Sequence, residues 1–190
     1  MNIKYKIEFH TDWHCGSGLS AGADVDALVV KDENGMPFVP GKTIKGLVRE
    51  SVEEIRGLQV KSTDDVVDAF GFFDKDSLTA KKGSMFFTNA ELEKEEYDAI
   101  VSNDAARFMY RDIASTAIDG DGIAKEHSLR KKQVVVPCTM QGKIHNVPNE
   151  QMADEIIEAM KFIKRMGQNR NRGLGRCTIT GRKEEDNDNA

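Results

Sequence analysis

The segment Pro40–Glu50, with the sequence PGKTIKGLVRE, has residue types that bind an anion at the start of a helix. A proline and a glycine precede a run with helical periodicity, and its first turns carry cations and a hydroxyl: Lys42, Thr43, Lys45 and Arg49. The first N–H groups of a helix lack intrahelical partners and lie at the positive end of the helix dipole. The segment therefore predicts a phosphate site, and the alternative is an ordinary helix with solvated lysines.

The triplet GKT at residues 41–43 does not make this segment a nucleotide-triphosphate loop. A Walker A motif needs a further glycine upstream at a fixed spacing, and this chain lacks it. Pro37 and Pro40 also remove backbone N–H groups that such a loop would use. The sequence thus excludes a nucleotide triphosphatase of that kind.

A second basic element, GQNRNRGLGR, runs from Gly167 to Arg176. Its glycines allow a close approach of the backbone to a ligand, and Arg170, Arg172 and Arg176 can fork onto phosphate oxygens. The segment follows an expected helix and precedes an expected strand, which is the wrong order for a dinucleotide-binding fingerprint. Its composition favours a nucleic-acid backbone as the ligand, and the alternative is a helix C-cap with incidental arginines.

Charge is unevenly distributed along this acidic chain of net charge −5. Residues 161–183 hold eight Lys/Arg and no Asp/Glu, whereas residues 62–104 hold eleven Asp/Glu against four lysines. This segregation predicts a basic face to which a polyanion can bind, although charges can also cluster by chance on solvated faces.

The 190 residues suit one domain, and 39% hydrophobic residues are enough for a core. No apolar run reaches the roughly 18 residues that a membrane span needs, and the alternating N-terminus does not resemble a signal peptide. We therefore expect no membrane partner and a cytoplasmic location. The three cysteines, which are widely spaced and odd in number, argue against a disulfide framework and a CxxC zinc site.

Hydrophobic periodicity predicts an α+β fold. We expect strands at 2–9, 25–32, 84–92, 107–114, 134–144 and 174–180, and helices at about 42–57, 63–69 and 150–166. The order fits a ferredoxin-like, RRM-like βαββαβ core. The long polar stretch after residue 114 predicts a thumb-like insertion at about 114–134. We expect a single domain over 1–183 and a disordered acidic tail at 184–190.

Four segments in the same order give the chain its resemblance to the RAMP superfamily of CRISPR-associated proteins. PFVPGKTIKGLVRE resembles the signature P-Y-I-P-G-S-S-L-K-G-x-x-R, and GQNRNRGLGRCTI resembles the C-terminal Gly-rich loop. The segments 69–92 and 116–144 are similar to the L-F-G…G-x-L-x-F-x-D-A and I-D-x-x-x-G-x-A…V-P-x-G-T-x-F motifs. The layout looks most like the repeated backbone subunit of type III effector complexes. Four positions depart from the motifs: Asn89, Gln133, Cys138 and Met140.

The resemblance implies a subunit that binds the backbone of a guide CRISPR RNA, next to copies of itself, other effector subunits and a target RNA. Ile118, Asp119 and the loop after them would belong to a thumb that interrupts the guide–target duplex. Sequence specificity would come from base pairing. Guide phosphates would be held by residues of the two basic elements: Lys42, Thr43, Lys45, Arg49, Gly167, Asn169, Arg170, Arg172 and Gly173.

The resemblance also points to Asp26 in AGADVDALVVKD as the catalytic residue of target-RNA cleavage. Counting back from VVKD aligns Asp26 with the first Asp of the family segment G-x-x-D-x-P-V-I-R-D, and Asp32 with the second; Asp24 is the rival by position. A loop carboxylate beside a kinked RNA phosphate could hold a divalent metal ion, Mg²⁺ or Mn²⁺, or help to activate the adjacent 2′-OH. The expected enzyme is a metal-dependent endoribonuclease.

Two alternatives remain. The chain could be a non-catalytic RNA-binding scaffold subunit, or a guide-processing RAMP ribonuclease with His10 or His14 as general acid or base. The cluster HTDWHC lacks a second Cys/His pair at zinc-ligand spacing, so structural or RNA-stacking roles are expected there, with Trp13 stacking on a base.

Overall fold

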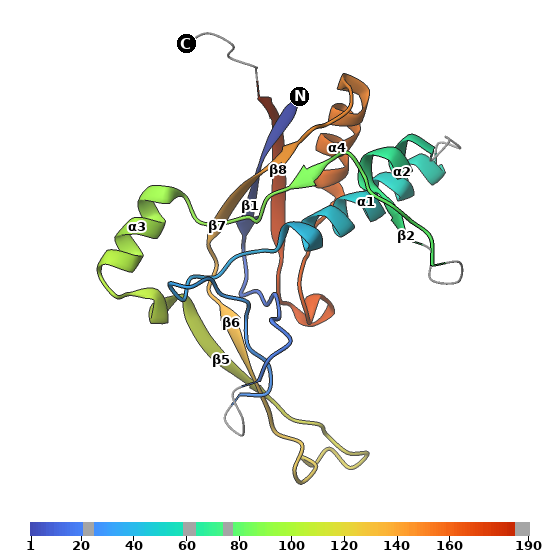
Figure 1. Cartoon of the computed structure of the whole chain (residues 1–190). Coiled ribbons are helices and arrows are strands. Elements are labelled where there is room, and N and C mark those ends of the chain that lie inside the picture. The colour runs from blue at the N-terminus through green and yellow to red at the C-terminus, as the bar shows by residue number, and fades with distance from the viewer. Residues whose placement is uncertain (21–24, 59–63, 74–77, 185–190) are drawn as a thin grey trace.

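The computed structural model describes residues 1–20, 25–58, 64–73 and 78–184 (Figure 1). The helices are α1 (Gly41–Leu58), α2 (Asp64–Phe70), α3 (Lys94–Ser102) and α4 (Glu150–Phe162), with the 3-10 turns η1 (Ala106–Met109) and η2 (Arg170–Arg172). The strands are β1 (Asn2–Phe9), β2 (Phe72–Phe73), β3 (Ala80–Lys81), β4 (Phe86–Phe87), β5 (Tyr110–Ser115), β6 (Arg130–Val135), β7 (Thr139–His145) and β8 (Cys177–Glu184).

The central sheet is antiparallel, with the strand order β4-β7-β1-β8. Helix α1 lies between β1 and β4 in the chain, and α4 lies between β7 and β8, so these six elements follow the order βαββαβ. The two edge strands are thus the second and fourth of the motif, as in ferredoxin-like folds. The predicted α+β class and core are confirmed.

Helices α1 and α4 cover one face of this sheet. The buried side chains of β1 alternate with exposed ones, and Ile3 and Ile7 lie among buried apolar residues of the two helices, such as Val48 and Met160. The Ser51 hydroxyl of α1 donates to the Ala159 carbonyl of α4 at 3.0 Å, which ties the helices together. Because alternate residues of a strand point to opposite faces, the polar set of β1 lies on the other face of the sheet.

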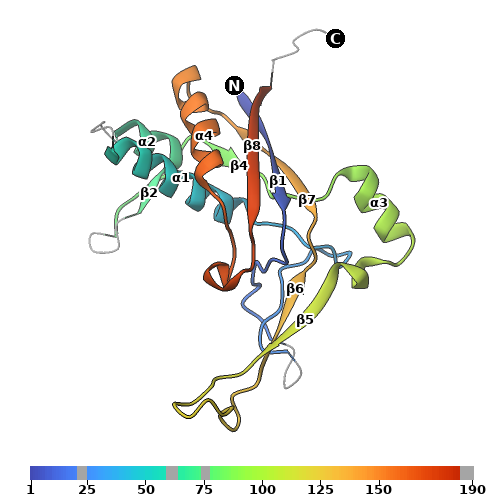
Figure 2. The same ribbon diagram turned by 180° about the vertical axis from the view of Figure 1, so that it is seen from behind.

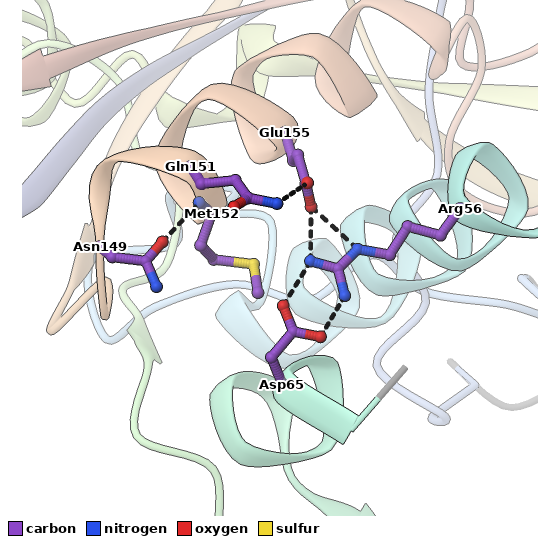
Figure 3. Close-up of polar contacts among 6 residues, drawn as sticks. All are labelled: Arg56, Asp65, Asn149, Gln151, Met152 and Glu155. Carbon is purple, nitrogen blue, oxygen red and sulfur yellow. Dashed lines mark hydrogen bonds and ion pairs between the residues drawn. The ribbon is translucent and has the colours of Figure 1, made fainter. Parts of the chain in front are cut away.

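A network around Arg56 joins α1 to α2 and α4 (Figure 3). The Arg56 guanidinium pairs with Asp65 of α2, and its Nη2 donates to the Glu155 carboxylate of α4 at 2.6 Å. Gln151 Nε2 donates to the other Glu155 oxygen at 3.0 Å, and the Asn149 side chain caps α4 by accepting from the Met152 N–H. The Arg56 side chain is only 3% exposed, so its charge is stabilised by these two carboxylates.

Three expected elements are wrong in detail. Residues 25–32 form no strand, because the segment makes single bridges to three different neighbours: Gly16–Val29, Ala27–Lys132 and Lys31–Pro37. The expected strand 134–144 is divided between β6 and β7, and the expected strand 84–92 is shortened to β4. Helix α3 was not expected, since it has no buried residue and thus only a weak apolar periodicity.

Strands β5 and β6 pair in a hairpin that projects from the sheet in both views (Figures 1 and 2). The hairpin contains the predicted insertion at 114–134, and the residues between its strands include Ile118 and Asp119. Its role as a thumb stays a prediction, as do the domain boundaries. The expected tail at 184–190 lies almost entirely outside the described residues. None of the described helices is long and apolar enough to cross a membrane.

Candidate nucleic-acid interface

The loop between α4 and β8 is built on close backbone contacts with the segment after β1. Gly167 has a φ of 87°, and a Cβ atom there would lie 2.4 Å from the His14 carbonyl oxygen, which accepts the Gln168 N–H at 2.9 Å. Gly175 has a φ of 68°, and a Cβ atom there would lie 1.9 Å from the Met166 carbonyl oxygen. These two glycines therefore fit the loop against the protein itself, whereas Gly173 faces open space.

The arginine side chains of this loop are exposed to solvent. Arg170, Arg172 and Arg176 are all exposed, and within the described part of the chain no side-chain hydrogen bond or ion pair engages their guanidinium groups. A guanidinium group without a partner can form two parallel hydrogen bonds to a phosphate. The loop therefore presents several donors for an anionic strand.

Lys132 of β6 ties the same loop to the outer half of the β5–β6 strand pair, where it is opposite Ile113. Its Nζ donates to Gln168 Oε1 at 3.1 Å and to Asn169 Oδ1 at 3.2 Å. Burial lowers the pKa of Lys132, and the charge of Arg172 lowers it further. Asn169 is thus fixed in part by an internal hydrogen bond, and Arg172 lies close enough to act on Lys132 electrostatically.

Asp26 lies beside the outer end of the same strand pair, where β6 begins with Arg130 and Lys131. The Lys131 N–H donates to one carboxylate oxygen at 2.8 Å, and Arg130 Nη1 lies 3.3 Å from the other. The side chain of Asp26 is 44% exposed and that of Arg130 is 69% exposed. The Lys131 N–H, helped by Arg130, holds the pKa of Asp26 below its usual range. The carboxylate is therefore ionised, oriented and open to solvent beside three consecutive basic residues.

The start of α1 has fewer free donors than expected. The Gly41 N–H donates to Asn89 Oδ1 at 3.0 Å, and the N–H groups of Thr43 and Ile44 donate to the Pro40 carbonyl. Among the first N–H groups of α1, only that of Lys42 has no partner within the described residues. Asn89 thus acts as the capping acceptor of this helix.

The cations of α1 lie on more than one side of the helix. Lys45 Nζ donates to the Met85 carbonyl at 3.2 Å, and Arg49 donates to the Gly71 carbonyl and to Glu53, each at 2.8 Å. Burial lowers the pKa of Lys45, with smaller contributions from Arg49 and Lys82. These side chains therefore bind the segments near β2 and β4.

The C-terminal loop meets a different face of α1. A groove of about 310 Å³ between them is lined by residues that include Leu47 and Glu50 of α1 and Arg170 of the loop. Helical spacing places Thr43 on the face of Leu47 and Glu50. The structure thus brings Thr43 toward the loop, while Lys45 and Arg49 lie on the other side of the helix. The RNA-binding roles of all these residues stay predictions.

The described residues contain no cluster of three His, Cys, Asp or Glu side chains that could hold a metal ion. Asp26 alone therefore does not make a resident metal site. Its donor set still fits Mg²⁺ or Mn²⁺ bound jointly with a substrate, because Mg²⁺ is commonly held by one or two carboxylates together with substrate phosphates. Asp24 lies outside the described residues, and Asp32 accepts hydrogen bonds from Tyr97 and from the N–H groups of Asn34 and Met36.

The aromatic and histidine residues after β1 are mainly structural. Trp13 is fully buried and stacks on Phe9 with ring centroids 4.5 Å apart, so the expectation that it stacks on a base is wrong. His14 is buried, its Nδ1 lies 2.6 Å from the Gln133 carbonyl oxygen, and burial lowers its pKa. His10 remains exposed, with Nε2 2.8 Å from the Thr178 hydroxyl. Trp13 is therefore inaccessible to a base, and His14 is neutral and inaccessible as a general base.

Sequence reasoning missed Arg130 and Lys132 as interface residues. The run LRKKQ gave a signal, because three consecutive cations precede an apolar strand. Nothing in the sequence, however, indicated that this run lies next to both Asp26 and the C-terminal loop. That proximity comes from the pairing of Ala27 with Lys132.

Comparisons with known proteins agree with this architecture. A model of the RAMP superfamily matches residues 6–178, and the chain therefore belongs to that superfamily, as its motifs predicted. No curated protein matches the chain.

Solved structures with the same fold come from CRISPR effector complexes. A chain of the type III-B Cmr-beta complex bound to cognate target RNA aligns with a TM-score of 0.73 at 11% identity, covering 95% of this chain and 97% of the other. A chain of the type III-B Cmr-beta complex in the apo state aligns with a TM-score of 0.70 at 11% identity, covering 97% of this chain and 98% of the other. A chain of a type IV-B CRISPR complex aligns with a TM-score of 0.63 at 10% identity, covering 100% of this chain and 96% of the other.

Proposed function

We propose that this chain is a guide-RNA-binding backbone subunit of an RNA-guided CRISPR effector complex. Its partners in that complex would be the guide CRISPR RNA, a target RNA, further copies of the chain and other effector subunits. Membership of the RAMP superfamily and the fold shared with subunits of type III-B and type IV-B complexes support this proposal.

The observation that carries the proposal is the exposed arginine loop at 167–176, held against strand β6 by Lys132. Its guanidinium groups have no internal carboxylate partner within the described residues, so they can pair with phosphates without breaking ion pairs of the protein. Contacts of this kind fix the path of a strand and carry no sequence information. Specificity would then come from the guide itself.

The test combines RNA recovery with a paired set of variants. The protein purified from its host should retain RNA of uniform length, which sequencing identifies as guide RNA. Arg170→Gln with Arg172→Gln should weaken RNA binding and reduce the slope of log affinity against log salt by about 0.7 per lost contact. Arg107→Gln with Lys81→Gln removes two exposed cations that lie outside the basic stretch 161–183 and serves as the matched control. Equal binding by both double variants would contradict the proposal.

A second, finer proposal concerns target-RNA cleavage through Asp26, and the observation that favours it is the ionised, oriented and exposed carboxylate. Asp26 would accept the proton of a 2′-OH as its oxygen attacks the adjacent phosphorus, and the departing 5′-oxygen would take a proton from water. Arg130 would turn from Asp26 to the phosphate and stabilise its charge.

A divalent ion bound jointly by Asp26 and the RNA would supply positive charge to the reacting phosphate. Asp26 would be its protein ligand, and Arg130 would have to leave the carboxylate first, because it contacts one of the oxygens. The non-catalytic scaffold and the guide-processing ribonuclease remain the alternatives. Cleavage of repeat RNA by the lone protein without metal would favour the latter, with His10 as the accessible histidine.

A further inference from the structure

The face of the central sheet opposite to α1 and α4 has an unusual arrangement of charge. On this open sheet face, Lys4 of β1 is directly opposite Lys143 of β7 on one side and Arg182 of β8 on the other. Directly opposed side chains of antiparallel strands lie about 5 Å apart, and like charges in such positions repel. Three cations therefore form one row across three strands.

Internal carboxylates neutralise this row only in part. Glu184 lies 2.7 Å from Lys143 Nζ and 3.9 Å from Lys4 Nζ, and the hydrogen bond from Lys143 holds the pKa of Glu184 below its usual range. Within the described residues no ion pair engages Arg182, nor Lys6 in the neighbouring row. Both side chains are exposed and line a hollow of about 440 Å³ on this face. The site thus has room and charge for an anion.

An aromatic pair lies at the β4 end of the same face. Phe86 of β4 is opposite His145 of β7, their rings stack with centroids 6.2 Å apart, and Phe86 is 61% exposed. The neighbouring Phe87 and Ile144 are buried against the helices, so Phe86 and His145 point to the open side. Exposed aromatic rings beside cations are the combination that binds single-stranded nucleic acid, because bases stack on the rings while cations hold the phosphates.

The open sheet face is continuous with the arginine loop through β8. Alternation along the strand places Thr178, Thr180 and Arg182 on this face. Arg176, the last residue of the loop, lies two positions before Thr178 and therefore continues the same exposed set. Figure 2 shows β8 and β1 running from the loop toward the far end of the sheet. From Arg176 to Arg182 the strand covers about 20 Å, at roughly 3.3 Å per residue.

We propose that the RNA strand held by the loop 167–176 continues over the open sheet face, where Lys6 and Arg182 bind its phosphates and Phe86 stacks on a base. This inference rests on the proposed RNA binding by the loop and adds a second surface to it. An acidic protein segment is the less suitable occupant, because among the described residues Phe86 is the only exposed large hydrophobic side chain on this face, too little for the apolar core of a protein interface.

RNA length separates the two surfaces in a binding experiment. We would use oligouridylates of about 4 and about 16 nucleotides, the range of site sizes of single-strand-binding domains. Lys6→Gln with Arg182→Gln should weaken binding of the long RNA and reduce its slope of log affinity against log salt by about 1.4. Binding of the short RNA should be unaffected. Arg107→Gln with Lys81→Gln is the charge-matched control, and it should change binding of neither length of RNA.

Phe86→Ala should lower the affinity for the long RNA about tenfold, because it removes a stacking contact. The slope of log affinity against log salt should not change, since stacking is not ionic. Phe108→Ala is its control, because Phe108 is 68% exposed and lies away from the sheet, next to Arg107. Unchanged binding of the long RNA by the sheet-face variants, or an equal loss at both lengths, would overturn the inference. Loss of a protein subunit from the complex with intact RNA binding would also overturn it. If the wild-type protein bound neither RNA, the proposed function itself would fail.

Discussion

Asp26 and Lys131 are joined by two reciprocal hydrogen bonds, one between backbone groups and one to the Asp26 carboxylate. The Asp26 N–H donates to the Lys131 carbonyl at 2.9 Å, and the Lys131 N–H donates to the Asp26 carboxylate at 2.8 Å. The segment that carries Asp26 forms no strand, so this contact and the Gln133 N–H to Ala27 carbonyl bond at 3.0 Å fix its position. A loop carboxylate is thereby held at a defined place beside the start of β6.

The first prediction concerns this carboxylate. In the assembled complex, Asp26→Asn should lower target-RNA cleavage about 100-fold or more, as expected for loss of a proton acceptor, while RNA affinity is unchanged. Because the pKa of Asp26 is held below the ordinary Asp value of about 3.9, protonation of this carboxylate should halve wild-type cleavage only at a pH below that value. Asp98→Asn on α3 is the matched control. If Asp26→Asn cleaved target RNA at the wild-type rate, Asp26 would not be catalytic and the scaffold role would be favoured.

The second prediction concerns Lys132, which joins the hairpin to the arginine loop. Lys132→Ala removes the donor to Gln168 and Asn169, so amide hydrogen exchange of residues 167–173 should become faster. RNA affinity should also fall, because a less ordered loop loses more entropy on binding. Lys131→Ala is the control, since only the backbone of Lys131 contacts Asp26. Equal exchange in both variants would show that Lys132 does not order the loop.

The sequence predicted the core well, because periodicity records local burial. Alternation in β1 and the apolar stripe of α4 identified both elements to within a few residues. What it could not predict were contacts between distant segments. The position of Asp26 depends on residues about a hundred positions away, and the Gly41 N–H at the start of α1 donates to Asn89, which follows α2 in the chain. The motifs nevertheless identified the superfamily, because they record such constraints residue by residue.

The third prediction compares two glycines of α1. A Cβ atom at Gly41 would lie 2.2 Å from the Phe87 carbonyl oxygen, so Gly41→Ala must move α1 away from β4. We expect a loss of about 1–3 kcal/mol in the free energy of unfolding. Gly46 has no atom within 4 Å of its would-be Cβ, and Gly46→Ala should stabilise the protein by up to about 1 kcal/mol through helix propensity. Urea unfolding measures both, and the same sign for both variants would contradict the close approach of α1 to β4.

The fourth prediction concerns Arg56, the buried cation between α1, α2 and α4. Arg56→Met removes the partner of Glu155 and Asp65, and breaking a buried ion pair in this way should cost about 3–5 kcal/mol of unfolding free energy. Asp65→Asn should cost about 1 kcal/mol or less, because the Asp65 side chain is half exposed.

The pH dependence of stability provides an independent measurement for the same network. The hydrogen bond from Arg56 holds the pKa of Asp65 below that of the unfolded chain, so the unfolded state binds a proton first as the pH falls. The stabilisation by Asp65 is complete above the unfolded pKa of about 3.9 and is lost as the pH falls from there through the folded pKa. Urea midpoints of the wild-type protein should therefore fall more steeply below about pH 4 than those of Asp65→Asn. Parallel curves would mean that the ion pair of Asp65 with Arg56 does not contribute to stability.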